Sequence, residues 1–178
     1  MKLNVPTLFV VLWMCAAGSA FAADAALAKP LEPLAPLLGK TWKGTFKEST
    51  PEKPMHDVAR WERALNGQAV RVLHSVNDGM YGGETLIIWD AAKSSLVYYY
   101  FTTAGFHTIG TMTVDGRKLT SREAVTGNAQ GITEVESVSE LLPDGTMRVI
   151  ASYLKDRQKV GGREVIYVEA PTAQVLFK

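Results

Sequence analysis

The chain has 178 residues, of which 47% are hydrophobic and 21% are charged, and its formal net charge is +1. This size and composition are typical of one folded domain and exclude a disordered or collagen-like protein. The balance of 19 basic against 18 acidic residues argues against a nucleic-acid partner, which would require an excess of basic surface.

The N-terminal segment predicts a secretory signal peptide. Lys2 precedes a short apolar stretch, and residues 20–22 form an Ala-Phe-Ala cleavage pattern. We expect cleavage after Ala22 and a periplasmic or secreted protein without stable membrane insertion, since the apolar stretch is shorter than the ~20 residues that span a bilayer. Cleavage would remove Cys15, the only cysteine, so the mature chain could form no disulfide and no thiolate-ligated metal site.

Residues 23–33 are interpreted as a linker and residues 34–178 as one barrel domain. Pro30, Pro33 and Pro36 exclude a long regular helix, because proline lacks the backbone donor that an α-helix uses. We expect about one helical turn over residues 34–38.

From residue 41 onward the pattern predicts strands and tight turns. Runs of β-forming residues alternate with short segments rich in glycine, asparagine and aspartate. The expected strands cover residues 41–47, 57–64, 69–76, 83–89, 96–103, 106–114, 119–125, 133–142, 147–154 and 163–169.

Short connections between these strands predict an antiparallel meander. The strongest hairpin signals are Asn66-Gly67, Ala104-Gly105, Asp115-Gly116 and Asp144-Gly145. About ten such strands would expose two open edges unless the sheet closed, so we expect an all-β, up-and-down β-barrel. A two-sheet sandwich is the alternative fold.

Hairpin geometry assigns the faces of two central strands. A two-residue loop at Ala104-Gly105 would pair Phe101 with Thr108. The inner face would then carry an aromatic and aliphatic set: Val97, Tyr99, Phe101, Phe106, Gly110, Met112 and Leu119. A slip of one residue would exchange the faces, and Tyr98, Tyr100, His107 and Arg122 would instead form a polar pocket suited to a carboxylate.

A second hairpin assigns the opposite wall. A three-residue turn over residues 143–145 places Glu140 opposite Arg148 on the outer face. The inner residues are then mostly small or hydroxylated: Thr133, Val135, Ser137, Ser139, Val149, Ala151 and Tyr153. Such a lining predicts an internal cavity rather than a filled core, although Tyr99, Phe101 and Met112 could fill the same space.

Four short motifs in order resemble a known family. They are residues 37–44 (Leu-Leu-Gly-Lys-Thr-Trp-Lys-Gly), 60–67 (Arg-Trp-Glu-Arg-Ala-Leu-Asn-Gly), 88–90 (Ile-Trp-Asp) and 103–106 (Thr-Ala-Gly-Phe). The series resembles the exported, lipocalin-like (calycin) bacterial domains of unknown function labelled DUF1579, and is distantly similar to nitrobindin-type barrels. The resemblance implies a barrel with a central cavity and a tryptophan, here Trp42, near its closed end. It implies no established reaction.

No catalytic motif is present: the chain has no G-x-S-x-G, no H-E-x-x-H and no EF-hand loop. Of three histidines, His74 shares a strand face with valines and should point inward, either as a hydrogen-bonded core residue or as a ligand contact. Glu123 falls on the inner face, within the cavity or at its rim. Nitrobindin-type barrels bind haem through a late histidine, and this chain has none after His107.

The leading hypothesis is an exported barrel that binds a small, largely apolar molecule without transforming it, as a monomer or weak dimer. Tyr99, Phe101, Phe106 and Met112 would line the pocket, while His74 and Glu123 would orient the polar end of the ligand. We expect no catalytic residues, metal ligands or cofactor, with haem as the alternative cofactor. A cavity-type enzyme acting on a small lipophile and a structural module of the cell envelope are the competing hypotheses.

Overall fold

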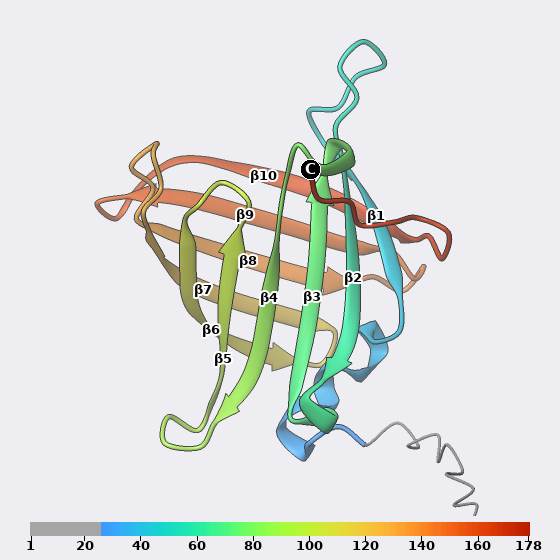
Figure 1. Ribbon diagram of the computed structural model, residues 1–178, viewed down its shortest axis with the longest axis vertical. Coiled ribbons are helices and arrows are strands. Elements are labelled where there is room, and N and C mark those ends of the chain that lie inside the picture. The colour runs from blue at the N-terminus through green and yellow to red at the C-terminus, as the bar shows by residue number, and fades with distance from the viewer. Residues whose placement is uncertain (1–25) are drawn as a thin grey trace, which may run out of the picture.

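Residues 26–178 form a closed antiparallel β-barrel in the computed structural model (Figure 1). Each strand pairs with its neighbours in sequence, and β1 closes the barrel against β10. The strands are β1 (Thr41–Phe46), β2 (His56–Ala64), β3 (Ala69–Val76), β4 (Tyr81–Asp90), β5 (Ser95–Thr102), β6 (His107–Asp115), β7 (Lys118–Thr126), β8 (Glu134–Leu141), β9 (Met147–Lys155) and β10 (Gln158–Glu169).

The predicted barrel is therefore confirmed and the sandwich is excluded. All ten expected strands form, with ends that differ by a few residues, because period-two alternation of apolar and polar residues dictates which face of a strand is buried. The predicted signal peptide and its cleavage site lie outside the described residues.

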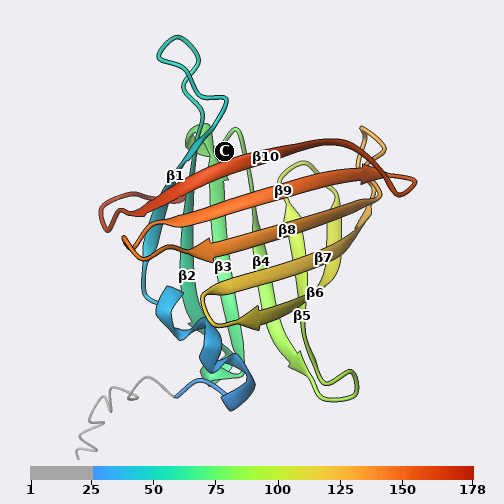
Figure 2. The same cartoon turned by 180° about the vertical axis from the view of Figure 1, so that it is seen from behind.

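A short helix closes one end of the barrel (Figure 2). The 3₁₀ helix η1 (Lys29–Leu37) begins five residues before the predicted helical turn, within the stretch interpreted as a linker. Its three prolines are tolerated because they lie on the exposed side at three-residue spacing, while Leu31, Leu34 and Leu37 form the opposite, buried side. The two other short helices, η2 (Leu65–Gly67) and η3 (Asn77–Gly79), lie in connections between strands.

The core lies at this closed end. Trp42, at the start of β1, is 1% exposed and belongs to the same buried cluster as Leu31 and Leu34 of η1. Trp42 therefore lies at the closed end of the barrel. Burial of leucines against an indole removes apolar surface from water and fixes η1 across the end of the barrel.

The connection between β5 and β6 corrects the predicted faces. The backbone N–H of Thr102 donates to the carbonyl of Phe106 at 3.2 Å. These two residues bound the loop, which therefore holds three residues, 103–105, rather than two. Gly105, at the end of this loop, has a φ of +80°, which a glycine adopts without strain. The additional loop residue pairs Phe101 with His107 instead of Thr108.

This one-residue shift exchanges the inward and outward faces of β5 relative to the prediction. Tyr98 and Tyr100 point into the barrel, whereas Tyr99 and Phe101 point outward and are 37% and 57% exposed. The faces of β6 and β7 are as predicted, since their turn lies at Gly116 and Arg117 and moves the register by two residues, which preserves the alternation.

The β8–β9 hairpin agrees with its prediction. Glu140 pairs with Arg148, and the inner face carries small and hydroxylated residues. The C-terminal tail after β10 crosses the outside of the barrel toward η3 (Figure 1), and the Leu176 backbone N–H donates to Ser75 Oγ of β3 at 3.0 Å. Among residues 26–178 no helix has the length and apolar character needed to cross a membrane.

Candidate functional site: the barrel lumen

The barrel encloses a cavity of about 790 Å³, within the ~300–1,000 Å³ range of small-molecule sites. Its floor is apolar and continuous with the core above η1, through Ile87, Met112, Leu119 and Met147. Its mouth is at the opposite end, where inter-strand loops contribute Met55, Ala104, Asn128 and Gln130. The lumen is therefore apolar at its floor, and its polar groups gather nearer the mouth.

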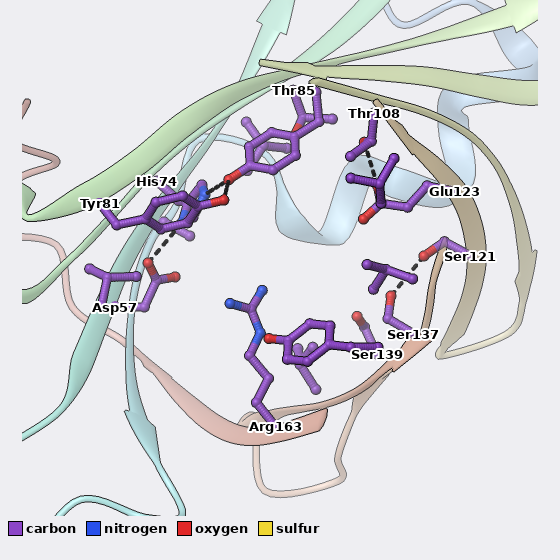
Figure 3. A pocket seen from close by; sticks show the side chains of 18 of the residues that line it. Asp57, His74, Tyr81, Thr85, Thr108, Ser121, Glu123, Ser137, Ser139 and Arg163 are labelled. Atoms are coloured by element: carbon purple, nitrogen blue, oxygen red, sulfur yellow. Dashed lines mark hydrogen bonds and ion pairs between the residues drawn. The ribbon is translucent and has the colours of Figure 1, made fainter. Parts of the chain in front are cut away.

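A chain of hydrogen bonds crosses one wall of the lumen (Figure 3). His74 Nδ1 lies 2.9 Å from Asp57 Oδ1, and His74 Nε2 lies 2.7 Å from the Tyr100 hydroxyl. The Tyr100 hydroxyl lies 2.7 Å from that of Tyr81. Strands β2, β3, β4 and β5 supply one member each, so the chain depends on the register of four neighbouring strands.

Asp57 is the fixed end of this chain. It is 3% exposed, and its second oxygen accepts a 2.7 Å hydrogen bond from the Tyr167 hydroxyl of β10. Because an ionised carboxylate only accepts, Nδ1 of His74 carries the proton. With a neutral imidazole, Tyr100 then donates to Nε2, Tyr81 donates to Tyr100, and the Tyr81 oxygen is left as an acceptor in the lumen.

Burial keeps the tyrosines of this wall protonated. Desolvation is the main cause that raises the pKa of Tyr81, and it raises the pKa of Tyr100 further. Tyr81 also stacks on Phe106 at the mouth, with ring centroids 6.3 Å apart. The tyrosines thus present hydroxyl groups rather than phenolates to the lumen.

Glu123 lies on the opposite wall and not at a hydrated rim. Its Oε2 accepts a 2.7 Å hydrogen bond from Thr108 Oγ1. Desolvation raises its pKa, and hydrogen bonds from Thr108 and Tyr98 and the charge of Arg163 oppose that shift. Nearby, the hydroxyls of Ser121 and Ser137 lie 2.7 Å apart, so this wall also carries hydroxyl groups.

Arg163 reaches into the lumen from β10 (Figure 3). It shares the inward face of the strand with Val165 and Tyr167. Its Nε is buried without a hydrogen-bond partner, and its guanidinium lies 5.9 Å from the centre of the Phe46 ring. Burial disfavours its charged form, but the negative charge of Asp57 helps to hold the pKa of Arg163 above its ordinary value.

Four of the six residues predicted to contact a ligand line the lumen: Phe106, Met112, His74 and Glu123. Tyr99 and Phe101 do not, for the register reason given above, and Phe101 instead stacks on the outward His107. The alternative polar pocket forms only in part. Tyr98 and Tyr100 face inward, whereas Arg122 faces outward and pairs with Glu134 at 2.5 Å.

Sequence reasoning missed Asp57, Arg163 and Tyr81, and it named Tyr100 only in the alternative pocket. A signal for two of them exists in the alternation of their strands. Arg163 has the same parity as Val165 and Tyr167, and Asp57 the same parity as Trp61. A charged residue in phase with inward apolar residues indicates a buried charge, which rarely occurs without a partner.

Haem ligation by His74 conflicts with the hydrogen bonds of its ring. Both ring nitrogens of His74 are hydrogen-bonded, so iron could bind Nε2 only by displacing the Tyr100 hydroxyl. Within residues 26–178, no cluster of three His, Cys, Asp or Glu side chains has metal-binding geometry. The lumen is instead suited to hydrogen bonding and to holding an organic molecule.

Comparison with models of known protein families finds no match to this chain, and comparison with curated proteins finds no matching relative.

Proposed function

We propose that this protein is an exported receptor that encloses a small, largely apolar molecule in its barrel. The cavity of about 790 Å³ with an apolar floor carries the proposal, because burial of a ligand there would contribute about 25 cal/mol per Å² of apolar surface removed from water, before entropic costs. Glu123 and the Tyr81 hydroxyl lie on opposite walls, where they could orient the polar end of the ligand, with His74 acting through its hydrogen bond to Tyr100.

Tryptophan fluorescence tests the proposal directly. Trp61 lines the lumen, whereas Trp42 is buried in the core. Titration with fatty acids, hydroxylated aromatic compounds and haem should give saturable quenching for at least one class. In Trp61→Phe the quenching should be lost while calorimetry still detects binding. No response from any class would contradict the receptor and favour a structural module of the cell envelope.

A pair of variants with a larger side chain inside or outside the barrel tests where the ligand binds. Ser137 faces the cavity and its neighbour Val138 faces outward on the same strand. Ser137→Phe should abolish or weaken binding by occupying the space a ligand needs, while Val138→Phe should bind as the wild type does. Equal binding by both variants would place the ligand outside the barrel.

A cavity-type enzyme is the second candidate, favoured by the hydrogen-bond chain from Asp57 to Tyr81. A proton taken from a ligand at Tyr81 could pass through Tyr100 to His74, whose charge Asp57 would stabilise. Mass spectrometry of bound compounds after incubation would detect product. Product that forms equally fast in His74→Asn, or no product from any compound, would contradict this candidate.

We also propose export with cleavage after Ala22, a monomer or weak dimer, and membership of the DUF1579 group. The N-terminal charge and apolar pattern support export, and the closed barrel with its buried Trp42 supports the family assignment. N-terminal sequencing of the protein from the periplasm or medium should begin at Ala23. Sedimentation of that material would give the oligomeric state.

A further inference from the structure

The guanidinium of Arg163 carries a positive charge in the lumen for which the structure shows no partner. Arg163 is the one lysine or arginine that lines the cavity in the described part of the chain. Its Nε is buried and has no hydrogen-bond partner, and within residues 26–178 no carboxylate lies in ion-pair contact with it. Arg163 is half-buried, and shielding part of a cation from water without a partner is costly, which is why such groups are normally paired.

Three acidic residues line the lumen: Glu48 is exposed in the loop after β1, and the other two are hydrogen-bonded to other groups. Both oxygens of Asp57 accept hydrogen bonds, one from His74 and one from Tyr167. Glu123 accepts from Thr108 on the far wall. Neither carboxylate is therefore directed at Arg163, although Asp57 contributes favourable potential at longer range.

The surroundings of Arg163 fit a single negative charge on a planar group. The ring of Phe46 lies beside the guanidinium, and the hydroxyl-bearing Tyr100, Tyr153 and Tyr167 line the same cavity. A guanidinium can donate two parallel hydrogen bonds to a carboxylate. One uncompensated cation suits a monoanion better than a phosphate dianion.

The position of Arg163 along β10 sets the orientation of a ligand. Val165, the next inward residue toward the closed end, belongs to the core cluster. The apolar floor therefore begins on one side of Arg163, and the mouth lies on the other. An acid with an apolar tail can place its tail on the floor and its carboxylate at the guanidinium.

We infer that Arg163 binds the carboxylate of a small apolar acid, and that this contact selects acids over neutral molecules of the same shape. The inference rests on the proposed receptor function and names its ligand class. A charge-assisted hydrogen bond contributes about 1.5–3 kcal/mol, which corresponds to roughly 10- to 100-fold in affinity.

Three probes of one chain length test it by calorimetry: decanoate, 1-decanol and decylammonium. The wild type should bind decanoate at least about tenfold more tightly than decanol, and decylammonium most weakly. In Arg163→Met the preference for decanoate should disappear while the affinity for decanol is unchanged. Arg148→Met removes an arginine from the outer surface, which pairs there with Glu164, and should bind all three as the wild type does.

Stability supplies a second readout that does not depend on binding assays. Without ligand, Arg163→Met should melt at or above the wild-type temperature, because an unpaired, half-buried charge has been removed. Decanoate should raise the melting temperature of the wild type more than that of the variant. If Arg163→Met fails to fold, Arg163→Gln and the three-probe comparison on the wild type still decide the question.

The outcomes separate the two proposals. Binding of decanol and decanoate with equal affinity to the wild type, or tightest binding of decylammonium, would overturn the carboxylate site and leave the apolar receptor standing. Absence of binding by all three probes would count against both.

Discussion

The ring of Tyr98 lies directly over Gly110, its partner on the neighbouring strand. A Cβ atom at position 110 would lie 2.5 Å from Cζ of Tyr98 and 2.6 Å from the carbonyl oxygen of Arg122. The absence of a side chain at Gly110 thus allows an inward tyrosine to lie across the sheet, close to the carboxyl group of Glu123.

Gly110→Ala should therefore destabilise the barrel by about 1–3 kcal/mol, the usual cost of overpacking, since one of the two crowded atoms belongs to the backbone. Chemical denaturation would measure the change. Gly161 offers a matched control on β10, because a Cβ there meets only Tyr153 at 3.6 Å. Equal stability of Gly110→Ala and Gly161→Ala would contradict the close packing of Tyr98.

Tyr167→Phe tests the fixed end of the hydrogen-bond chain. The change leaves Oδ2 of the buried Asp57 without its donor, so the free energy of unfolding should fall by about 1.5–3 kcal/mol. Tyr153→Phe is the control, since its hydroxyl makes no hydrogen bond with the described residues. A larger loss for Tyr153→Phe than for Tyr167→Phe would argue against this role of Asp57.

Glu123→Gln should change how stability depends on pH. Burial raises the pKa of Glu123 above its ordinary value of 4.5, so between that value and the native pKa the folded state holds a proton that the unfolded chain has released. Stability then falls as the pH rises through this window. The glutamine variant should lack this decline and be more stable than the wild type above it. Denaturation curves across the window with parallel pH profiles would contradict the prediction.

Leu34→Ala tests the closure by η1. Leu34 is fully buried in the core cluster, and its truncation should cost about 2–5 kcal/mol, as for other large-to-small core changes. Glu32→Ala alters the exposed side of the same helix and should change stability little. If both variants unfold alike, η1 does not hold the closed end of the barrel.

The sequence predicted the strands and the closed barrel, because alternation along each strand and glycine-containing turns are local signals. The face of β5 could not be predicted, since Tyr98, Tyr99 and Tyr100 are chemically equivalent and only the loop length decides which of them point inward. Gly110 carried a usable signal, as a glycine within a strand indicates a close approach by another group.

The charged residues of the lumen were harder to predict than the strands. Arg163 and Asp57 are residue types that are usually exposed, and their inward position becomes evident only when the alternation of their strand neighbours is considered. The bonds that link Asp57, His74, Tyr100 and Tyr81 join four strands. A contact between strands depends on every register between them, so no local pattern could predict it.

Closure of the sheet also constrains how the polypeptide folds. The pairing of Trp42 with Glu169 joins the first strand to the last, so one edge of β1 stays unpaired until β10 is available. Contacts so distant in sequence form slowly. A chaperone that shields this edge would therefore raise the yield of the intact protein, and a chain cut short before β10 would tend to self-associate.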